Sequence, residues 1–141
     1  IFMTTSTEDY LRVLYSLYEK QKGNLHGIKS IEVVNEMNLS KPSVSSMLKK
    51  LAKQGYLRLR PYGKIFFTIK GLKKAAKIMH NHRLIEVFLT DVLCYKIDHV
   101  HEEAHRLEHA FSEESIKRLD RFLNNPVLSP FGKRIPHEDM K

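Results

Sequence analysis

The sequence contains a single cysteine, Cys94, and no apolar run long enough to cross a membrane. One thiol cannot form an internal disulfide, and because Cys94 ends an apolar run we expect it to be a buried structural thiol. We also find no internal repeat, no low-complexity tract and nothing that resembles a signal peptide, with Met3 a candidate natural start. These features exclude a disulfide scaffold. With 42% hydrophobic residues, the chain is typical of a cytoplasmic globular protein of one or two small domains.

Acidic residues are scarce in the first half of the chain only. Residues 1–72 contain 12 Lys and Arg against 5 Asp and Glu, a net charge of +7, whereas residues 73–141 contain 12 against 11, a net charge of +1. This asymmetry indicates that the first half meets a polyanion and that the second half has another task. We therefore expect two domains, 1–72 and 73–141.

The first half predicts three helices in the order of a helix-turn-helix. An apolar stripe at helical spacing predicts a helix over 7–20, and a second, short helix is expected over 28–37. A tight turn then leads into a third helix. Ser40 suits its N-cap and Gly55 the position just past its end.

A β-hairpin, or wing, is expected after the third helix, because residues 56–60 and 65–69 read as strands around a turn. The third helix has an apolar face, which includes Val44 and Leu48, and an opposite face of hydroxyl groups and lysines. A recognition helix in a DNA major groove requires such an exposed polar face. The alternative is the same fold with a solvated basic surface. The residues expected to contact DNA are Ser40, Lys41, Pro42, Ser43, Ser46, Lys50, Tyr62 and Lys64.

Histidines gather in the second half, where six of the eight lie within residues 80–109. In a helix over 101–109, four imidazole and carboxylate side chains share one face, next to an apolar face. Such ligands at i, i+3 and i+4 spacing can converge on one divalent ion, so a metal site is the leading hypothesis. A solvated polar helix face is the alternative. The four side chains are His101, His105, Glu108 and His109.

The same segment matches a zinc-peptidase pattern. His101-Glu102-x-x-His105 is a literal HExxH, in which the glutamate would be the general base. The pattern is short, and a peptidase would also need a third ligand and a substrate cleft. A chain of 141 residues whose first half is otherwise occupied leaves little to build that cleft. We therefore expect no enzyme and keep the metallopeptidase as an alternative.

The remaining segments are expected to be helical and to form a homodimer. Residues 71–93 read as a nearly unbroken helix whose end is apolar on more than one face, which suits a core or a dimer interface. His82 and Glu86 on this helix are either further metal ligands or a solvent-exposed pair. A last helix is expected over 112–123. Its inward side chains should be Ile116, Leu119, Phe122 and Leu123.

Specific motifs are spread along residues 5–136. They are Ser6-Thr7-Glu8-Asp9-Tyr10-Leu11-Arg12, Ser40-x-Pro42-Ser43-Val44-Ser45, His82-Arg83-Leu84-x-Glu86, Val100-His101-x-Glu103-Ala104, Glu108-His109 and Ser129-Pro130-Phe131-Gly132-x-x-Ile135-Pro136. With these motifs the chain resembles the diphtheria toxin repressor and manganese transport regulator family of metal-activated transcriptional repressors. The resemblance implies a mainly α fold, with an N-terminal winged helix-turn-helix domain followed by an all-α metal-binding and dimerisation domain. By this resemblance we expect a short form of the family that lacks the SH3-like domain of the longer members.

The resemblance also implies two metal sites. The primary site would comprise Asp9, His105, Glu108 and His109, and the ancillary site His82, Glu86 and His101. Asp9 matches the manganese-type members at a variable ligand position. Two residues depart from the family pattern, since His105 stands where those members have glutamate or cysteine, and Arg12 replaces a second carboxylate. Ser6-x-x-Asp9 also matches a capping box, which gives Asp9 a structural alternative.

Together these features predict a cytoplasmic homodimer that binds a double-stranded DNA operator when it holds a divalent metal. Mn²⁺ is the expected ion, with Fe²⁺ or Zn²⁺ as alternatives, because the expected ligands are oxygens and imidazole nitrogens without a thiolate. The expected role is repression of metal-homeostasis genes. A metal-independent DNA-binding protein remains the other alternative.

Overall fold

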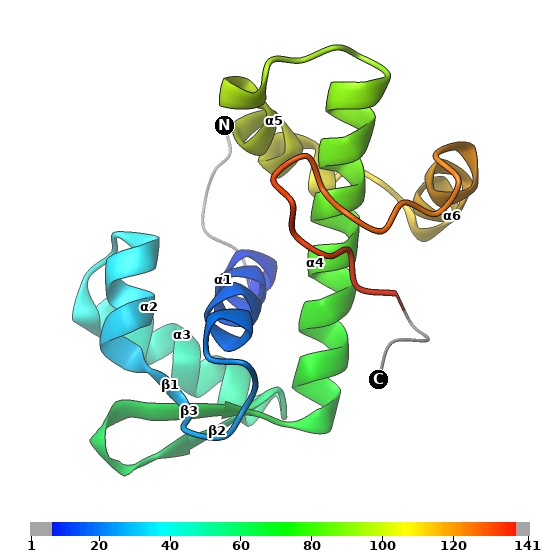
Figure 1. The fold of residues 1–141 in the computed structure, drawn as a ribbon. Helices are drawn as coiled ribbons and strands as arrows, with labels where there is room; N and C mark the ends of the chain where they lie inside the picture. Colours follow the sequence, from blue (N-terminus) through cyan, green and yellow to red (C-terminus); the bar gives the residue numbers. More distant parts are fainter. Residues whose placement is uncertain (1–6, 138–141) are drawn as a thin grey trace. The chain divides into compact units, whose positions relative to one another are not determined.

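The computed structural model describes residues 7–137 of the chain. These residues form two compact units, divided between Ile78 and Met79; the expected boundary after residue 72 stays a prediction. No helix in the described range is long and apolar enough to cross a membrane. The elements, drawn in Figure 1, are α1 (Thr7–Lys20), β1 (Ile28–Lys29), α2 (Ser30–Met37), α3 (Lys41–Lys53), β2 (Leu57–Arg60), the 3-10 turn η1 (Pro61–Gly63), β3 (Lys64–Phe67), α4 (Ile69–Asp91), α5 (Ile97–Glu108) and α6 (Glu113–Phe122).

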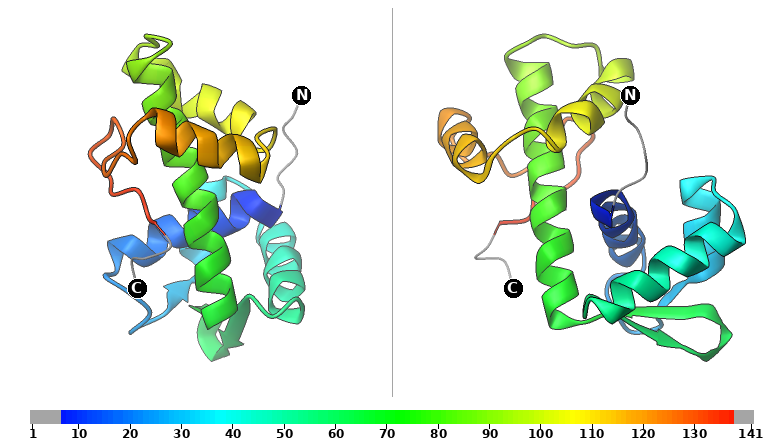
Figure 2. Two further views of the ribbon diagram at one scale, coloured as in Figure 1. Left: turned by 90° about the vertical axis from the view of Figure 1, so that its right-hand side faces the viewer. Right: turned by 180° about the vertical axis from the view of Figure 1, so that it is seen from behind.

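The first unit joins α1, α2 and α3 to a three-stranded antiparallel sheet of order β1-β3-β2. The β2–β3 hairpin is the expected wing, and it is seen with α3 in the right-hand view of Figure 2. The helix expected over 28–37 begins later, at Ser30, because Ile28 pairs with Ile65 of β3 and so belongs to the sheet. The core is built from side chains of all these elements. Its fully buried members include Leu11, Leu14, Ile28, Val33, Leu51 and Ile65.

The turn between α2 and α3 has the local chemistry that the sequence predicts. Asn38 ends α2 in the left-handed conformation (φ 55°), which asparagine tolerates better than most residues. Ser40 then caps α3, because its Oγ accepts the backbone N–H of Ser43 at 3.3 Å. Gly55 follows α3 with a φ of +87°, a region that favours glycine. These residues fix where α3 starts and stops.

The junction between the wing and α4 differs from the sequence-based expectation. Residues 65–69 were expected as a strand, but the strand ends at Phe67, and Ile69 already opens α4. Thr68 is responsible, because its hydroxyl accepts the N–H of Gly71 at 2.9 Å and donates to the carbonyl of Gly55 at 2.6 Å. Thr68 therefore acts as the N-cap of α4 and ties that helix to the end of α3.

The second unit consists of the later turns of α4, α5, α6 and the segment that follows α6. Its core contains Leu84, Ile85 and Leu89 of α4, together with side chains of α5 and α6. The segment after α6 is held by Arg83, whose Nη1 donates to the carbonyl of Arg134 at 2.6 Å.

Two expectations for the second unit are wrong. Phe122 was expected to point inward but is 68% exposed, since α6 ends there and Leu123 packs against the core instead. Cys94 was expected to be buried but is exposed, because it lies in the loop after α4 with a positive φ of 59°.

Gly71 supplies a test of the α3–wing–α4 junction. A Cβ at this position would lie 1.9 Å from the backbone oxygen of Tyr56, which cannot move aside as a flexible side chain could. We expect Gly71→Ala to lower the free energy of unfolding by roughly 1–3 kcal/mol, although alanine is the better helix former. Urea denaturation followed by circular dichroism measures this change. Lys74→Ala, at an exposed position of the same helix, is the control, and equal stability of the two variants would contradict the packing argument.

Candidate metal centre and nucleic-acid interface

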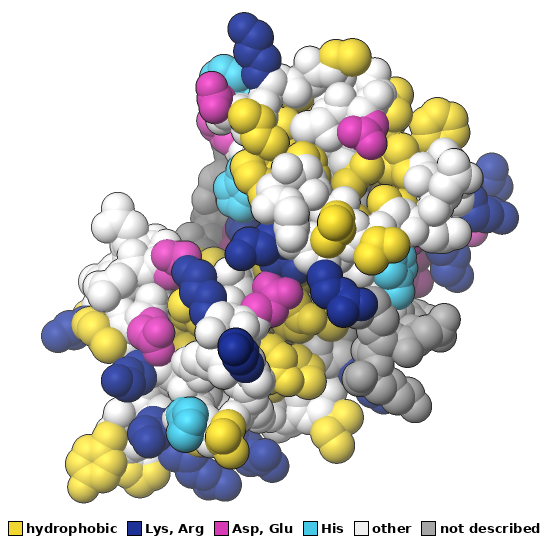
Figure 3. Space-filling model, in the orientation of Figure 1, with side chains coloured by type: hydrophobic (Ala, Val, Ile, Leu, Met, Phe, Trp, Pro, Cys, Tyr) yellow, Lys and Arg dark blue, Asp and Glu magenta, His cyan; other side chains and the backbone are white. Residues whose placement is uncertain are grey.

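The eight residues expected to contact DNA all lie in the first unit and are all exposed. Five of them occupy the first three turns of α3, and Ser40 is its N-cap. Tyr62 and Lys64 lie on the wing, where Tyr62 is 98% exposed. Figure 3 shows that Lys and Arg side chains gather over the wing and the neighbouring part of this unit. Their contact with DNA stays a prediction.

A groove between α3 and the wing adds to this surface. Its lining includes four basic residues, Lys41, Lys49, Arg60 and Lys64, and contains no acidic residue. Lys49 was not among the residues expected to contact DNA, although an exposed lysine between Leu48 and Lys50 could have been included from its position on the helix. The groove presents positive charge at the junction of helix and wing, which suits a phosphate backbone.

A second concentration of polar groups lies in the second unit, where α4 and α5 bring together His82, Glu86 and His101. Ligand atoms of these three residues lie within 4.8 Å of one another. Glu86 Oε2 is 3.2 Å from His82 Nε2 and 3.3 Å from His101 Nδ1. His82 and Glu86 are 2% and 3% exposed, so the alternative of a solvent-exposed pair is wrong.

Charge on Glu86 is stabilised inside this cluster. Burial raises the pKa of the Glu86 carboxyl. Hydrogen bonds from His101 and His82, together with the positive charge of these residues, lower the pKa by more than burial raises it, to about 2. Glu86 is therefore a carboxylate at neutral pH in spite of its burial. An ionised buried carboxylate facing two imidazoles is a ready donor set for a divalent cation.

The end of α5 forms another cluster around Glu108. The Oε1 atom of Glu108 is 4.0 Å from His105 Nε2 and 3.7 Å from His109 Nε2, while its side chain is only 4% exposed. His109 is the residue that follows the last turn of α5 and keeps right-handed helical angles, so its ring stays near that of His105. The helical spacing predicted these three side chains and His101 on one face; the three lie together, whereas His101 lies in the Glu86 cluster.

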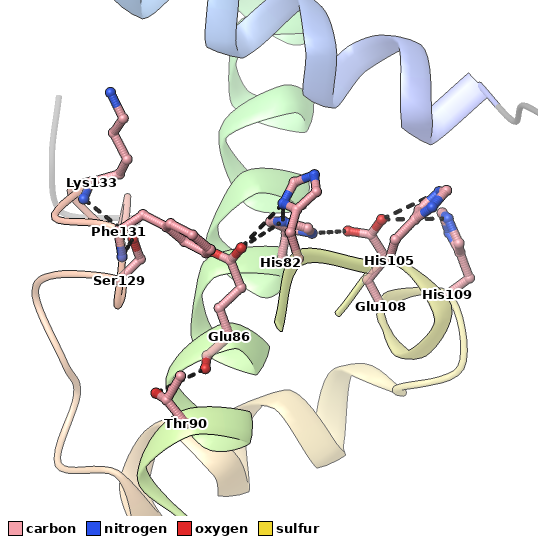
Figure 4. Close-up of polar contacts among 10 residues, drawn as sticks. His82, Glu86, Thr90, His105, Glu108, His109, Ser129, Phe131 and Lys133 are labelled. Carbon is pink, nitrogen blue, oxygen red and sulfur yellow. Dashed lines mark hydrogen bonds and ion pairs between the residues drawn. The ribbon is translucent and has the colours of Figure 1, made fainter. Parts of the chain in front are cut away.

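His82 connects the two clusters, as Figure 4 shows. Its Nδ1 lies 2.9 Å from Glu108 Oε2, and its Nε2 faces Glu86 and His101. Because a carboxylate only accepts hydrogen bonds, His82 Nδ1 must donate to it. By the same rule Nε2 donates to Glu86 Oε2, 3.2 Å away, so His82 bridges the two carboxylates, and a cation bound in the Glu86 cluster would replace its Nε2 proton.

Asp9 is the remaining residue of the expected primary metal site. Asp9 lies on α1 in the first unit and is 5% exposed; its role as a ligand stays a prediction. The capping-box alternative involves Ser6, which lies outside the described residues.

The HExxH residues do not come together. His101 belongs to the Glu86 cluster and His105 to the Glu108 cluster. Glu102, the general base of the peptidase alternative, is 73% exposed in its side chain and pairs with Arg106 at 3.2 Å. A peptidase needs both histidines on one ion and the glutamate beside it, so this geometry disfavours the alternative.

The fold and the polar clusters together define the class of the protein. It is a winged helix-turn-helix protein with an exposed basic face, joined to a helical unit that contains buried imidazole–carboxylate clusters. The family model described as iron dependent repressor, N-terminal DNA binding domain, matches residues 2–65, and the one described as iron dependent repressor, metal binding and dimerisation domain, matches residues 68–137. The chain belongs to the iron-dependent repressor family, which confirms the resemblance and the expected fold class.

Relatives within the family differ in length from this chain. The iron-dependent repressor IdeR of Mycobacterium leprae is 37% identical over 134 residues, which cover 95% of this chain and 56% of that protein. An uncharacterised HTH-type transcriptional regulator of Methanocaldococcus jannaschii is 39% identical over 121 residues, which cover 86% of this chain and 94% of that protein. The chain thus spans about half the length of the IdeR-type relatives.

Solved structures of metal-dependent regulators have the same fold as this chain. The metal-dependent transcriptional regulator MtsR has a TM-score of 0.85 and 38% identity, over 96% of this chain and 61% of that one. A manganese-dependent transcriptional repressor in complex with manganese has a TM-score of 0.84 and 32% identity, over 96% and 61% of the two chains. The family comprises transcriptional repressors with a metal-binding domain.

Glu102 and Glu108 offer a matched pair for testing the metal centre. Both lie on α5, but Glu102 is exposed and Glu108 is buried among His82, His105 and His109. We expect Glu108→Gln to weaken Mn²⁺ binding at least tenfold, because it removes a charged ligand. Glu102→Gln should bind Mn²⁺ as the parent does. Isothermal titration calorimetry measures both, and equal weakening of the two variants would contradict the assignment of Glu108.

Proposed function

We propose that this chain is a metal-activated, DNA-binding transcriptional repressor that works as a homodimer. The observation that carries the proposal is the buried Glu86–His82–Glu108 array, which joins two imidazole–carboxylate clusters in a chain that also has a winged helix-turn-helix. Buried charged groups that can hold a cation, on a protein with a basic DNA-facing surface, suit a regulator whose ligand is a metal ion. Family membership supports the same function.

The second unit has a surface suited to self-association. Several of its large apolar side chains are exposed, and yellow patches mark this unit in Figure 3. Grouped exposed apolar side chains indicate an interaction surface, and the match to a dimerisation domain supports a second copy of the chain as the partner. The exposed side chains are Val92, Leu93, Tyr95, Ile97, Phe122, Val127, Leu128 and Phe131.

In the proposed mechanism His105, Glu108 and His109 would hold a divalent ion, and Asp9 would be a further ligand of that ion. Asp9 lies on α1 of the DNA-binding unit, so the ion would restrict how the recognition helices of a dimer are separated. Two half-sites on DNA are read together only at a matching separation, so metal and operator affinity must rise together. The assignment of Asp9 rests on the family pattern.

The metal dependence is the first test of this mechanism. A duplex selected from a random pool in the presence of Mn²⁺ provides the operator, and fluorescence anisotropy measures binding. We expect Mn²⁺ to increase affinity at least as fully as Zn²⁺, although Zn²⁺ binds such ligands more tightly, because four-coordinate zinc can leave Asp9 unbound. Asp9→Ala should lose the Mn²⁺ response and still dimerise, and Asp9→Met should shift the response away from Mn²⁺.

Glu8→Ala, which removes the neighbouring carboxylate of α1, is the matched control for Asp9→Ala and should respond to Mn²⁺ as the parent does. If Asp9→Ala keeps the response of the parent, the ion does not act through α1.

The DNA interface is tested by two lysines with different expected roles. Lys50 lies on the exposed face of α3 and should read bases, so Lys50→Ala should abolish preference for the selected duplex and leave Mn²⁺ binding intact. Lys64 on the wing should contact phosphate, so Lys64→Ala should weaken binding to all duplexes alike and reduce the slope of log affinity against log salt by about 1. Competition with unrelated duplex at several salt concentrations separates the two effects. Parental behaviour of both variants would refute the proposed interface.

A further inference from the structure

A third polar cluster lies in the second unit, away from the residues assigned above. It combines His80 of α4, Asp120 of α6 and His137 of the segment after α6, and one ligand atom of each lies within 4.8 Å of the others. No sequence motif indicates this cluster, because its residues are 40 and 17 positions apart and come from three separate segments.

Both histidines of this cluster are oriented by backbone carbonyl groups. His80 Nδ1 is hydrogen-bonded to the oxygen of Pro136, and His137 Nε2 lies 3.1 Å from the oxygen of Pro126. A carbonyl oxygen only accepts, so these two nitrogens carry hydrogen. The other nitrogens, His80 Nε2 and His137 Nδ1, are then available as lone-pair donors. Metal-binding histidines characteristically have this arrangement, with the second ring N–H donated to a carbonyl or carboxylate.

Asp120 supplies an oxygen to the same place. Its Oδ2 atom is 2.7 Å from His80 Nε2, and the two side chains are 16% and 13% exposed. Two lone-pair atoms at this distance repel each other unless a proton or a metal cation lies between them. The second oxygen, Oδ1, is buried and has no hydrogen-bond partner among the described residues. A cation would satisfy both oxygens, whereas a proton on His80 would leave Oδ1 unpaired.

We propose that His80, Asp120 and His137 form a zinc-type site that holds the C-terminal segment against α4 and α6. Two imidazoles and a carboxylate, with water as a fourth ligand, are a familiar donor set for Zn²⁺. Donor atoms around a tetrahedral zinc lie roughly 3.3 Å apart, so the His80–Asp120 contact would open by about half an ångström on binding. The site is independent of the proposed repressor mechanism, since its role is to fasten a segment rather than to report on metal supply.

Zinc stoichiometry of the full chain tests this site. Equilibrium dialysis with Zn²⁺, followed by elemental analysis, should give one ion fewer per chain for Asp120→Asn and for His137→Gln than for the parent. His99→Gln, at an exposed histidine outside the clusters, is the matched control and should equal the parent. Circular dichroism verifies folding. His137→Gln keeps the test valid if Asp120→Asn does not fold, because His137 lies outside the hydrophobic cores.

The outcomes separate this proposal from the repressor function. Loss of one ion from both cluster variants, with the Mn²⁺ response of operator binding unchanged, supports the site. Parental zinc stoichiometry in a folded His137→Gln or Asp120→Asn variant overturns it and makes the cluster a protonated His80–Asp120 pair. Failure of the repressor function alone would appear instead as a parent chain that does not respond to Mn²⁺.

Discussion

The hydrogen bond between His82 Nδ1 and Glu108 Oε2 is the constraint on which the second unit depends. It joins α4 to α5 through two side chains that are 3% and 4% exposed, at 2.9 Å. Removing a carboxylate from water costs several kcal/mol unless its oxygens are matched by donors, so this contact fixes how the two helices pack. The apolar core beside it, with Leu84, Ile85 and Ala104, would tolerate small shifts of one helix on the other. The buried pair restricts them.

The same contact makes the two clusters interdependent. Glu108 holds the proton on His82 Nδ1, so a cation bound beside Glu86 and His101 would take the place of the Nε2 proton. An ion that draws Glu108 toward His105 and His109 would change the hydrogen bond that orients His82. Metal bound at one cluster would therefore alter the donor properties of the other, and the coupling would run through a single imidazole ring. If both clusters hold metal, their binding affinities would be coupled rather than independent.

The sequence predicted the elements that are determined locally. The bounds of α1 and α3 follow from apolar spacing and, for α3, from Ser40 as cap, and both agree with the structure. The two-residue strand β1 was missed because it exists only through pairing with β3, where Ile28 lies opposite Ile65, 37 positions later in the chain. Exposure of Phe122 and Cys94 was also missed, since apolar character alone does not say whether a residue meets a core or a surface.

The sequence could predict which residue types gather near α5, but not which of them contact one another. Helical spacing alone places His101, His105, Glu108 and His109 on one face, yet the structure divides them between two clusters. The division arises because His82 and Glu86 of α4 lie opposite the first turns of α5 and take His101 as their partner. That arrangement depends on how two helices pack, which a periodic pattern in one of them does not contain. The family motifs implied a grouping of His101 with His82 and Glu86 because they come from proteins in which these helices pack together.

The DNA-binding unit has its positive charge whether or not metal is present. The basic groove residues Lys41, Lys49, Arg60 and Lys64 lie on secondary structure held by its own core and caps, without a metal ligand among them. The sequence-independent attraction to phosphate, which depends on the number of such contacts, is therefore a fixed property of this unit. A metal ion can change only whether two such units reach their half-sites together. In the proposed mechanism, control by metal would therefore act on the ratio of specific to non-specific affinity, through an ion held by the buried carboxylates of the second unit.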